Sequence, residues 1–443
     1  MPLFAAETLN PGVRRREVLG WALYDFANSG YTTVVLTAVF NAYFVGVVAG
    51  GADWATLAWT LTLGLSSGVV MLTMPTLGAY ADLRAAKKRL LVLATVGCVA
   101  GTAVLALAGP GDLWLAVAAV IASNICYAYG ESLIASFLPE LARREALGRV
   151  SGWGWSFGYF GGMLTLGLSL GYVLWAQGQG IPATQFVPVT LLITAVIYAL
   201  AAVGTFVLLK ERAVAQPASV RADGLVQALQ RLARTWREAQ RYSDFAWLLA
   251  CAASYQAGIS VVIALAAVYA EQVLGFQQAQ TMALIFLVNI AAAAGAFGFG
   301  YGQDRIGHRP ALAITLWGWI VMSLLAVAAT SPPLFWAAAV LAGLCMGSSQ
   351  SAGRAMAGLF APPERLAEFY GLWTFATRLS AIVGPVTYGL VTWLSGGNHR
   401  LAILSTGVFF VAGLVLLRKV NVQRGAAAAM AGSPGPVPGP GLK

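Results

Sequence analysis

Apolar segments about 20 residues long recur twelve times in this sequence, and each is long enough to cross a lipid bilayer as a helix. The hydrocarbon core offers no partners to backbone polar groups, so such segments cross it as helices whose hydrogen bonds are internal. The composition agrees, because 59% of the residues are hydrophobic and only 10% are charged, whereas soluble domains carry about 25% charged residues. The segments begin near Val18, Ala55, Arg89, Asp112, Val150, Val187, Asp244, Gln278, Pro310, Leu334, Glu368 and Leu401. We therefore predict an all-α polytopic membrane protein with twelve transmembrane helices.

The positions of the basic residues predict how the chain is oriented. The sequence has 27 Lys and Arg residues and a net charge of +10. If the N-terminus is cytoplasmic, almost all of these residues fall in cytoplasmic segments, as the positive-inside rule requires. Both termini are therefore predicted to be cytoplasmic, and the plasma membrane is the expected location. Because membrane orientation accounts for the basic residues, the lipid bilayer is the expected partner and nucleic acid is not.

The longest polar interruption separates the first six apolar segments from the last six. In this interruption, residues 224–241 place apolar side chains on one helical face and arginines largely off it, which predicts an amphipathic helix on the anionic membrane surface. A solvated linker helix is the alternative. The C-terminal tail is rich in Pro and Gly and is predicted to be disordered. The predicted divisions are a cytoplasmic N-terminal segment at 1–17, a six-helix bundle at 18–209, a linker at 210–243, a second six-helix bundle at 244–418 and the tail at 419–443.

Two short motifs at matching positions of the two halves indicate an internal repeat. "GAYADLRAAKKR" follows the second apolar segment and "GYGQDRIGHR" follows the eighth, and in each a glycine stands four residues before an aspartate. Glu140 and Glu364 lie at matching positions of a second pair of loops. Matched loops of this kind predict parallel repeats related by an axis along the membrane normal.

Six plus six helices, a central linker and the repeated G-x-x-x-D motif resemble the major facilitator superfamily over essentially the whole helical core. The second copy of the motif is close to the superfamily's pattern, whereas the first has Leu83 where an arginine is usual. The resemblance implies two pseudo-symmetric six-helix bundles and loops that hold one face of a transporter shut. An aspartate beside the N-terminus of another helix has an electrostatic reason to do this. The gating residues so implied are Gly78, Asp82, Arg84, Gly300, Asp304, Arg305 and Arg309.

The stretch "WALYDFANS" at residues 21–29 narrows the resemblance. It is similar to the start of the vacuole-effluxer-like permease family, known from an autophagy-related vacuolar amino-acid exporter. Residues 137–162 and 347–373 resemble the same family. The resemblance makes amino-acid efflux the leading function, although members of the family need not share one substrate.

Four ionisable side chains lie deep within the apolar segments, where a charge is costly unless it faces water or a partner. They are Asp25, Glu131, Arg354 and Arg378. Polar side chains recur at helical spacing around the first three. In the superfamily that this chain resembles, helices 1, 4, 7 and 10 line the central cavity. The cavity residues predicted on these helices are Tyr24, Asp25, Asn28, Tyr127, Glu131, Tyr255, Gln256, Gln350 and Arg354.

Two interpretations of the four charges stay open. In the first, a zwitterionic solute binds with its carboxylate on Arg354 and its ammonium group on Asp25 or Glu131. In the second, Glu131 pairs with Arg354 as a brace between the halves. Asp25 then pairs with Arg378, which is our candidate for a structural ion pair. Desolvation favours the neutral form of a carboxylate, so Asp25 and Glu131 are also the candidates to carry a proton; transport without a proton is the alternative.

We therefore predict a secondary transporter that moves a small polar metabolite by alternating access and functions as a monomer. A sugar or other organic-solute symporter is the alternative within this fold, with Trp153 and Trp155 as stacking platforms. A non-transporting membrane sensor is the alternative of another class. An enzyme is not expected, because His308 and His399 are the only histidines and both lie at loops. ATP-driven pumping is not expected either, since the sequence has no phosphate-binding G-x-x-x-x-G-K-[ST] loop. No cofactor is expected, and no metal is expected because the four cysteines show no metal-ligand spacing.

Overall fold

The computed structural model describes residues 6–215, 241–276 and 278–431, and regular secondary structure in these residues is helical apart from one isolated bridge between Leu9 and Ala142. The first half contains η1 (Ala6–Thr8), α1 (Arg15–Tyr31), η2 (Thr32–Ala38), α2 (Phe40–Tyr43), η3 (Phe44–Val48), α3 (Ala55–Arg84), α4 (Lys87–Leu105), α5 (Leu113–Ala135), α6 (Leu138–Leu141), η4 (Arg144–Ala146), α7 (Leu147–Gly178) and α8 (Ala183–Leu208). The second half contains α10 (Ser243–Leu274), α11 (Gln278–Ile306), α12 (His308–Ala328), α13 (Pro332–Phe360), η6 (Pro363–Arg365), α14 (Leu366–Leu394), α15 (His399–Leu417) and α16 (Val422–Ala431). The prediction of an all-α protein is confirmed.

In the described part of the chain, 11 helices are long and apolar enough to cross a membrane. The first of them runs from Arg15 to Val48 through α1, η2, α2 and η3. Helix α14 occupies the predicted eleventh segment and has 29 residues, but it is not among the 11. Glu368 and Arg378 are two of the polar residues that lower its hydropathy. The structure thus supports a polytopic helical protein, while the twelfth crossing and the cytoplasmic termini stay predictions.

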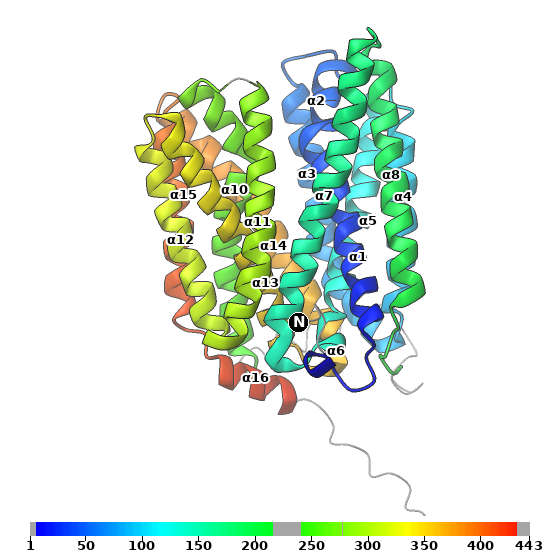
Figure 1. Cartoon of the computed structure of the whole chain (residues 1–443), viewed down its shortest axis with the longest axis vertical. Coiled ribbons are helices and arrows are strands. Elements are labelled where there is room, and N and C mark those ends of the chain that lie inside the picture. The colour runs from blue at the N-terminus through cyan, green and yellow to red at the C-terminus, as the bar shows by residue number, and fades with distance from the viewer. Residues whose placement is uncertain (1–5, 216–240, 277, 432–443) are drawn as a thin grey trace, which may run out of the picture.

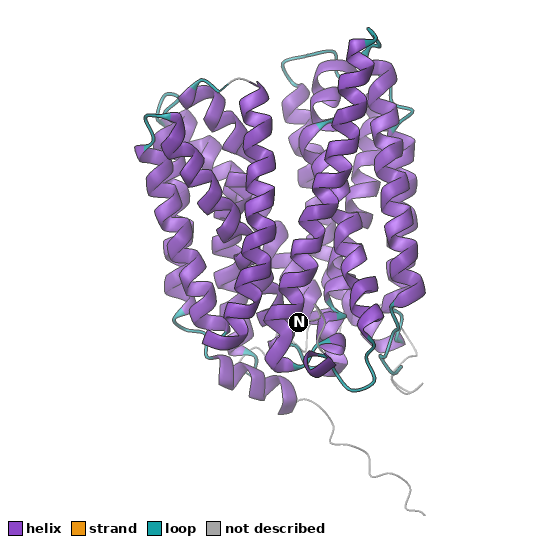
Figure 2. Cartoon of the chain, viewed as in Figure 1, coloured by secondary structure: helices purple, strands orange, loops and turns teal. Residues whose placement is uncertain are grey.

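Two helical bundles lie side by side, α1 to α8 in one and α10 to α15 in the other (Figure 1). They converge at the end where the N-terminus, α6 and α16 lie, which we call the termini face, and they separate toward the opposite end, which we call the distal face. Within each bundle, long helices are joined by short loops (Figure 2). Consecutive long helices therefore run in opposite directions, as the alternation of apolar segments and polar loops predicts.

Close backbone contacts join the two halves near the termini face. Helix α3 packs against α14, and α7 packs against α11, so each half contributes one helix to each crossing. At Gly78 of α3, an added Cβ would collide with the carbonyl oxygen of Ala367 on α14. At Gly300 of α11, an added Cβ would lie 2.8 Å from the carbonyl oxygen of Gly148 on α7. Both glycines of the repeated motif therefore permit a close approach between helices of opposite halves.

Two predictions about polar segments have different outcomes. Residues 422–431, which we predicted to belong to a disordered tail, form helix α16 instead. Asp244 at the start of α10 gives the physical reason, since its carboxylate accepts hydrogen bonds from the Arg424 side chain at 2.6 and 2.8 Å and from the Asn421 N–H at 2.7 Å. The predicted amphipathic helix at 224–241 falls almost entirely outside the described residues.

Candidate functional site

A cavity of about 600 Å³ lies between the two halves. Its lining begins near the termini face at Asp25 and Arg354 and reaches Phe335, three residues after the distal start of α13. At the termini face the halves are in contact, and the Ser132 hydroxyl donates to the Tyr370 carbonyl oxygen across them at 3.2 Å. The cavity therefore extends toward the distal face and ends above a closed termini face.

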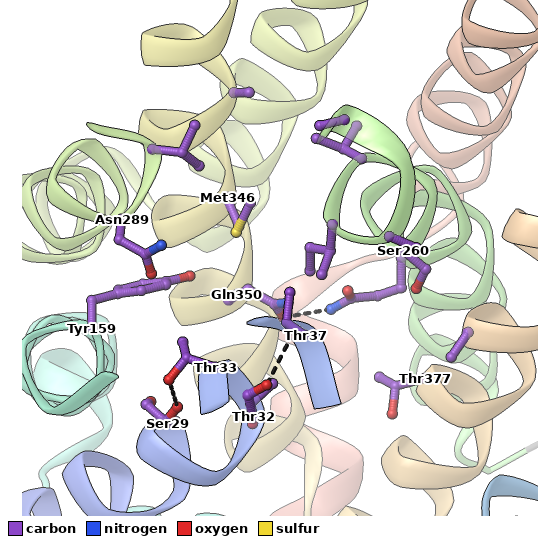
Figure 3. A pocket seen from close by; sticks show the side chains of 18 of the residues that line it. Ser29, Thr32, Thr33, Thr37, Tyr159, Ser260, Asn289, Met346, Gln350 and Thr377 are labelled. Carbon is purple, nitrogen blue, oxygen red and sulfur yellow. Dashed lines mark hydrogen bonds between the residues drawn. The ribbon is translucent and has the colours of Figure 1, made fainter. Parts of the chain in front are cut away.

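The wall from the first half is polar. Figure 3 shows hydroxyl side chains of the first membrane-spanning helix along it. Here the chain changes from α-helix to the π-helical segment η2, whose wider turn places residues five apart on one face. The Thr37 hydroxyl donates to the Thr32 carbonyl oxygen at 2.9 Å, and the Thr33 hydroxyl donates to the Ser29 carbonyl oxygen at 2.9 Å. The polar lining of this helix comprises Asp25, Asn28, Ser29, Thr32, Thr33, Thr37 and Asn41.

The wall from the second half is mostly apolar. Its apolar side chains from α10, α11, α12, α13 and α15 include Val262, Ile263, Leu284, Val288, Met322, Phe335, Ala342, Met346 and Ile403, whereas α14 contributes the polar Thr374, Thr377 and Arg378. A pair of amides interrupts it, because the Gln256 side chain donates to the Gln350 side-chain oxygen at 2.7 Å (Figure 3). Both amides were predicted as cavity residues, and the structure brings them together at the lining.

One ion pair at the closed end of the cavity is almost fully enclosed. Arg354 of α13 binds Asp25 of α1 at 2.6 Å, and the two side chains are 7% and 11% exposed. The same guanidinium donates to the hydroxyl of Ser151 at 3.1 Å and to its carbonyl oxygen at 2.8 Å. Its carbon lies 4.7 Å from the ring centre of Trp21 and 5.2 Å from that of Trp155. An arginine of the second half is thus held inside the first half by hydrogen bonds, charge and cation–π contacts.

A second ion pair is more open to the cavity. Arg378 of α14 binds Glu131 of α5 at 2.7 Å, with side chains 15% and 40% exposed. The guanidinium carbon lies 5.8 Å from the ring centre of Tyr127. The Nε of Arg378 is buried without a hydrogen-bond partner. This pair therefore keeps hydrogen-bonding capacity that the Asp25–Arg354 pair has already used.

The observed pairing differs from the structural interpretation of the sequence, which joined Glu131 with Arg354. Residues at equivalent positions of two repeats are related by the pseudo-symmetry axis, and this relation does not make them neighbours. Helix α13 packs against α7, and α5 packs against α14. Arg354 therefore reaches Asp25 and Ser151, while Glu131 meets Arg378.

The structure places two predicted cavity residues outside the lining. Tyr24 is fully buried within the first half, where its hydroxyl lies 2.9 Å from the Thr95 hydroxyl and accepts from Tyr198 at 3.3 Å. Tyr255 is fully buried in the second half, with its hydroxyl against Gly353 of α13. Both tyrosines belong to helices that reach the cavity, but their hydroxyl groups lie on helix faces that pack against neighbouring helices.

Several lining residues were not predicted. Thr33, Thr37 and Asn41 continue the polar face of the first helix beyond the expected stripe, and Tyr159 and Asn289 add polar groups from α7 and α11 (Figure 3). The sequence carried a signal for the lining residues of the first helix, because Thr32 and Thr37 are five residues apart and a π-helix places residues five apart on one face. The α-helical period used for the prediction does not place residues five apart on one face.

The two aspartates of the repeated motif lie at helix N-termini of the opposite half. Asp82 of α3 accepts the backbone N–H groups of Ala367 and Glu368 at 3.1 and 2.9 Å, where α14 begins. Asp304 of α11 accepts those of Gly148 and Arg149 at 3.0 and 3.1 Å, where α7 begins. A carboxylate in this position satisfies free N–H groups and interacts favourably with the helix dipole. The two contacts are symmetric and both fasten one half to the other.

The same loops also carry basic residues. Arg84 and Arg305 are exposed, and Arg309 donates to the Arg418 carbonyl oxygen of its own half at 3.1 Å. Within the first half, Glu211 accepts the N–H groups of Lys87 and Lys88 at 2.7 and 3.0 Å, where α4 begins. Burial raises the pKa of Glu211 above its ordinary value, and these hydrogen bonds partly oppose the rise.

Among the described residues, no group of three or more His, Cys, Asp and Glu side chains is arranged to hold a metal ion. The cavity can instead offer a solute two ion pairs, neutral hydroxyls and amides from the first half, and a mostly apolar surface with the Gln256–Gln350 amide pair from the second. Such a combination, a mostly apolar pocket with a few polar groups that fix orientation, is typical of small-molecule sites.

The comparisons with known proteins concern both sequence and fold. A family model described as "Vacuole effluxer Atg22 like" matches residues 44–430. The "Uncharacterized MFS-type transporter YxiO" of Bacillus subtilis is 25% identical over 407 residues, which cover 90% of this chain and 93% of the relative. "Autophagy-related protein 22-1" of Aspergillus niger is 27% identical over 216 residues, which cover 45% of this chain and 35% of that protein.

Two solved structures show the fold. The human organic anion transporter MFSD10 has a TM-score of 0.73 at 18% identity and covers 91% of this chain and 99% of its own. The proton:xylose symporter XylE has a TM-score of 0.70 at 15% identity and covers 92% of this chain and 95% of its own. These similarities, together with the two bundles, the repeated motif and the central cavity, identify the chain as an integral multi-pass membrane protein of the Atg22-like vacuole effluxer family, with the fold of the major facilitator transporters.

Proposed function

We propose that this protein carries a small amphipathic zwitterion, an amino acid with an apolar side chain, across the membrane by alternating access. The observation that carries the proposal is the contrast between the two cavity walls. Hydroxyls, amides and charged groups line the first half, and aliphatic side chains, Phe335 and two methionines line most of the second. A solute with a charged head and an apolar body satisfies both walls, and amino-acid efflux is the function that the sequence resemblance implies.

The charged head group of the solute fits the Glu131–Arg378 pair better than Arg354, which we first considered as the partner of the solute carboxylate. Each of the three guanidinium nitrogens of Arg354 already donates a hydrogen bond to Asp25 or Ser151, so a solute carboxylate would compete with those bonds. Arg378 instead has an unpartnered Nε and a single carboxylate partner. In the proposal, Arg378 receives the solute carboxylate and Glu131 faces the ammonium group. Trp155, whose buried indole N–H has no partner, and the two glutamine amides line the same cavity and would orient the solute.

The proposed cycle is a rocking of the two halves about this site. In the present arrangement the termini face is closed by the Asp82 and Asp304 contacts, and the cavity extends to the distal face. The alternative arrangement would release those contacts and open the termini face. With cytoplasmic termini and twelve crossings, as the sequence predicts, transport would run between the distal compartment and the cytoplasm. The comparisons lend no support to our expectation of the plasma membrane, because the family description names the vacuole.

Asp25 and Glu131 are the candidates for a proton-carrying acid, because they are the carboxylates among the described residues that line the cavity. The sugar alternative is less favoured. Trp153 is 5% exposed and donates to the Tyr301 hydroxyl at 3.1 Å, so it offers no stacking surface to the cavity. Trp155 lines the cavity, but it also lies over Arg354.

Counterflow in proteoliposomes tests the proposed function. Vesicles containing the purified protein are loaded with an excess of one unlabelled solute, and uptake of the same labelled solute is followed for leucine, alanine, glutamate and glucose. We expect exchange of leucine, weaker exchange of alanine, and none of glutamate or glucose, because only leucine places an apolar body on the second half. Protein-free vesicles supply the background. Exchange of glucose without any amino acid would favour the sugar alternative, and no exchange of any solute would contradict transport.

A further inference from the structure

Asn28 of α1 lies at the boundary between the cavity and the buried interior of the first half. It belongs to the cavity lining, yet it is only 5% exposed. Its side-chain oxygen accepts a hydrogen bond of 2.5 Å from the hydroxyl of Tyr198 on α8. Tyr198 is 1% exposed and is not among the described residues that line the cavity. The oxygen edge of the Asn28 amide therefore points into the interior of the first half.

A short chain of hydroxyl groups fixes the direction of this hydrogen bond. The Thr95 hydroxyl donates to the Leu91 carbonyl oxygen at 2.8 Å, so the Thr95 oxygen is left to accept from the Tyr24 hydroxyl, 2.9 Å away. Tyr198 lies closer to Asn28, at 2.5 Å, than to the Tyr24 hydroxyl, at 3.3 Å. A separation of 2.5 Å fits an O–H···O bond and is shorter than a normal N–H···O bond. The amide is thus held with its oxygen, and not its nitrogen, toward Tyr198.

The nitrogen edge of the same amide has no partner. Nδ2 of Asn28 is buried and makes no hydrogen bond. Buried donors without a partner are rare in native structures and cost more than donors that are bonded. Because Asn28 belongs to the lining of a polar wall, its N–H groups are donors in reserve for an acceptor that enters the cavity.

The packing of α1 on α5 places this donor close to the site proposed for the solute carboxylate. Gly130 of α5 lies against the Tyr24 hydroxyl. Tyr127 of α5 stacks on Tyr31 with ring centres 5.1 Å apart. Asn28 lies between these two tyrosines of α1, so it is level with the turn of α5 that carries the acid of the more open ion pair. That acid and Asn28 both belong to the cavity lining.

From this arrangement we propose that Asn28 is a second ligand of the solute carboxylate, beside Arg378, and that Tyr198 is a positioning residue that keeps the N–H groups of Asn28 available to the solute. The inference rests on the proposed function and adds a determinant of its specificity. A carboxylate has lone pairs for more hydrogen bonds than one guanidinium supplies, so it can accept from Asn28 while Arg378 holds it. The arrangement selects a solute that presents an acceptor to Asn28.

Two substitutions of Asn28 test the donor. Asn28→Asp changes the shape little and can still accept from Tyr198, but it offers no N–H to the solute and repels its carboxylate. Asn28→Ala removes both edges of the amide without adding a charge, so it answers the question even if the aspartate disturbs folding. We expect the half-saturating leucine concentration in counterflow to rise roughly 10- to 100-fold in Asn28→Ala, the loss typical of one hydrogen bond to a charged group. Asn28→Asp should be at least as impaired, and the maximal rate of Asn28→Ala should change less than its half-saturating concentration.

The outcomes separate this inference from the proposed function. A half-saturating concentration at the wild-type value in Asn28→Ala would overturn the assignment of Asn28 and leave amino-acid transport standing. Absence of leucine counterflow by the wild-type protein would instead count against the proposed function itself. Gel filtration of each variant verifies that the protein is folded and monodisperse.

Tyr198→Phe separates positioning from packing. The change keeps the ring and removes only the hydroxyl that holds the amide, so we expect the half-saturating leucine concentration to rise roughly 2- to 10-fold, as for loss of one neutral hydrogen bond. Adding Tyr198→Phe to Asn28→Ala should cause no further rise, because Tyr198 acts through the amide. Full additivity of the two changes would contradict the positioning role.

Tyr43→Phe is the matched control. Tyr43 is also a buried tyrosine of the first half, and its hydroxyl donates to the Ala108 carbonyl oxygen at 3.0 Å, but it is not among the described lining residues. This variant loses a comparable hydrogen bond and should keep the wild-type half-saturating concentration. An equal rise in Tyr43→Phe and Tyr198→Phe would mean that the effect comes from general packing of the first half and would overturn the role of Tyr198.

Discussion

Arg354→Gln is expected to abolish transport and to destabilise the folded protein by about 3–5 kcal/mol, the usual consequence of removing one partner from a buried ion pair. The change leaves the Asp25 carboxylate buried without its cation and removes two hydrogen bonds to Ser151. Because these contacts join the second half to the first, their loss also weakens the closed termini face. Thermal unfolding in detergent and leucine counterflow measure the two effects.

The matched control is Arg16→Gln, since Arg16 is exposed on α1, the helix that carries Asp25. We expect it to change stability by less than about 0.5 kcal/mol, as is typical of surface substitutions. The double variant Asp25→Asn with Arg354→Gln should recover part of the lost stability, because no unpaired charge is then buried. A single Arg354→Gln variant with wild-type stability and transport would contradict the role assigned to this pair.

Gly78→Val is expected to prevent closure of the termini face. A side chain at this position would collide with the carbonyl oxygen of Ala367 on α14, so α3 and α14 could not approach as they do here. Overpacking of this kind costs about 1–3 kcal/mol, which shifts a two-state equilibrium by roughly 5- to 150-fold. We expect a folded protein whose leucine counterflow falls by a factor in that range.

Gly68→Val is the matched control for that change. Gly68 belongs to the same helix, and an added Cβ there meets no atom within 4 Å. It should leave counterflow close to the wild-type rate. Equal losses in both variants would mean that the effect comes from a β-branched residue in α3 and has nothing to do with the contact between the halves.

Much of the fold could be predicted from the sequence because its signals are strong and local. The length of each apolar segment predicts a helix, and the repeated G-x-x-x-D motif predicts that two carboxylates lie at helix N-termini. The expectation of disorder was wrong for residues 422–431, because the contact between Asp244 and Arg424 that supports α16 joins positions far apart in the sequence.

The cavity was less predictable, because its geometry depends on how helices from different halves face each other. All four ionisable residues singled out in the sequence line the cavity, but their pairing requires knowledge that α13 packs against α7 and α5 against α14. Tyr24 and Tyr255 carry the same hydroxyl as Tyr127, and only tertiary packing separates the two buried phenols from the one at the cavity. The apolar wall of the second half could not be recognised in the sequence, because nearly all the long helices are apolar and most of their apolar side chains face lipid or other helices.

In the proposed function, a solute binds in the central cavity on Arg378 and crosses the membrane there. The most direct measurement is leucine counterflow in proteoliposomes that contain the wild-type protein or Arg378→Gln, with gel filtration to verify folding. Glu131 is 40% exposed, so the lone carboxylate left by this change remains accessible to water in the cavity. We predict rapid exchange by the wild type and exchange close to that of protein-free vesicles in the variant. Exchange by Arg378→Gln at the wild-type rate would contradict binding of the solute on Arg378.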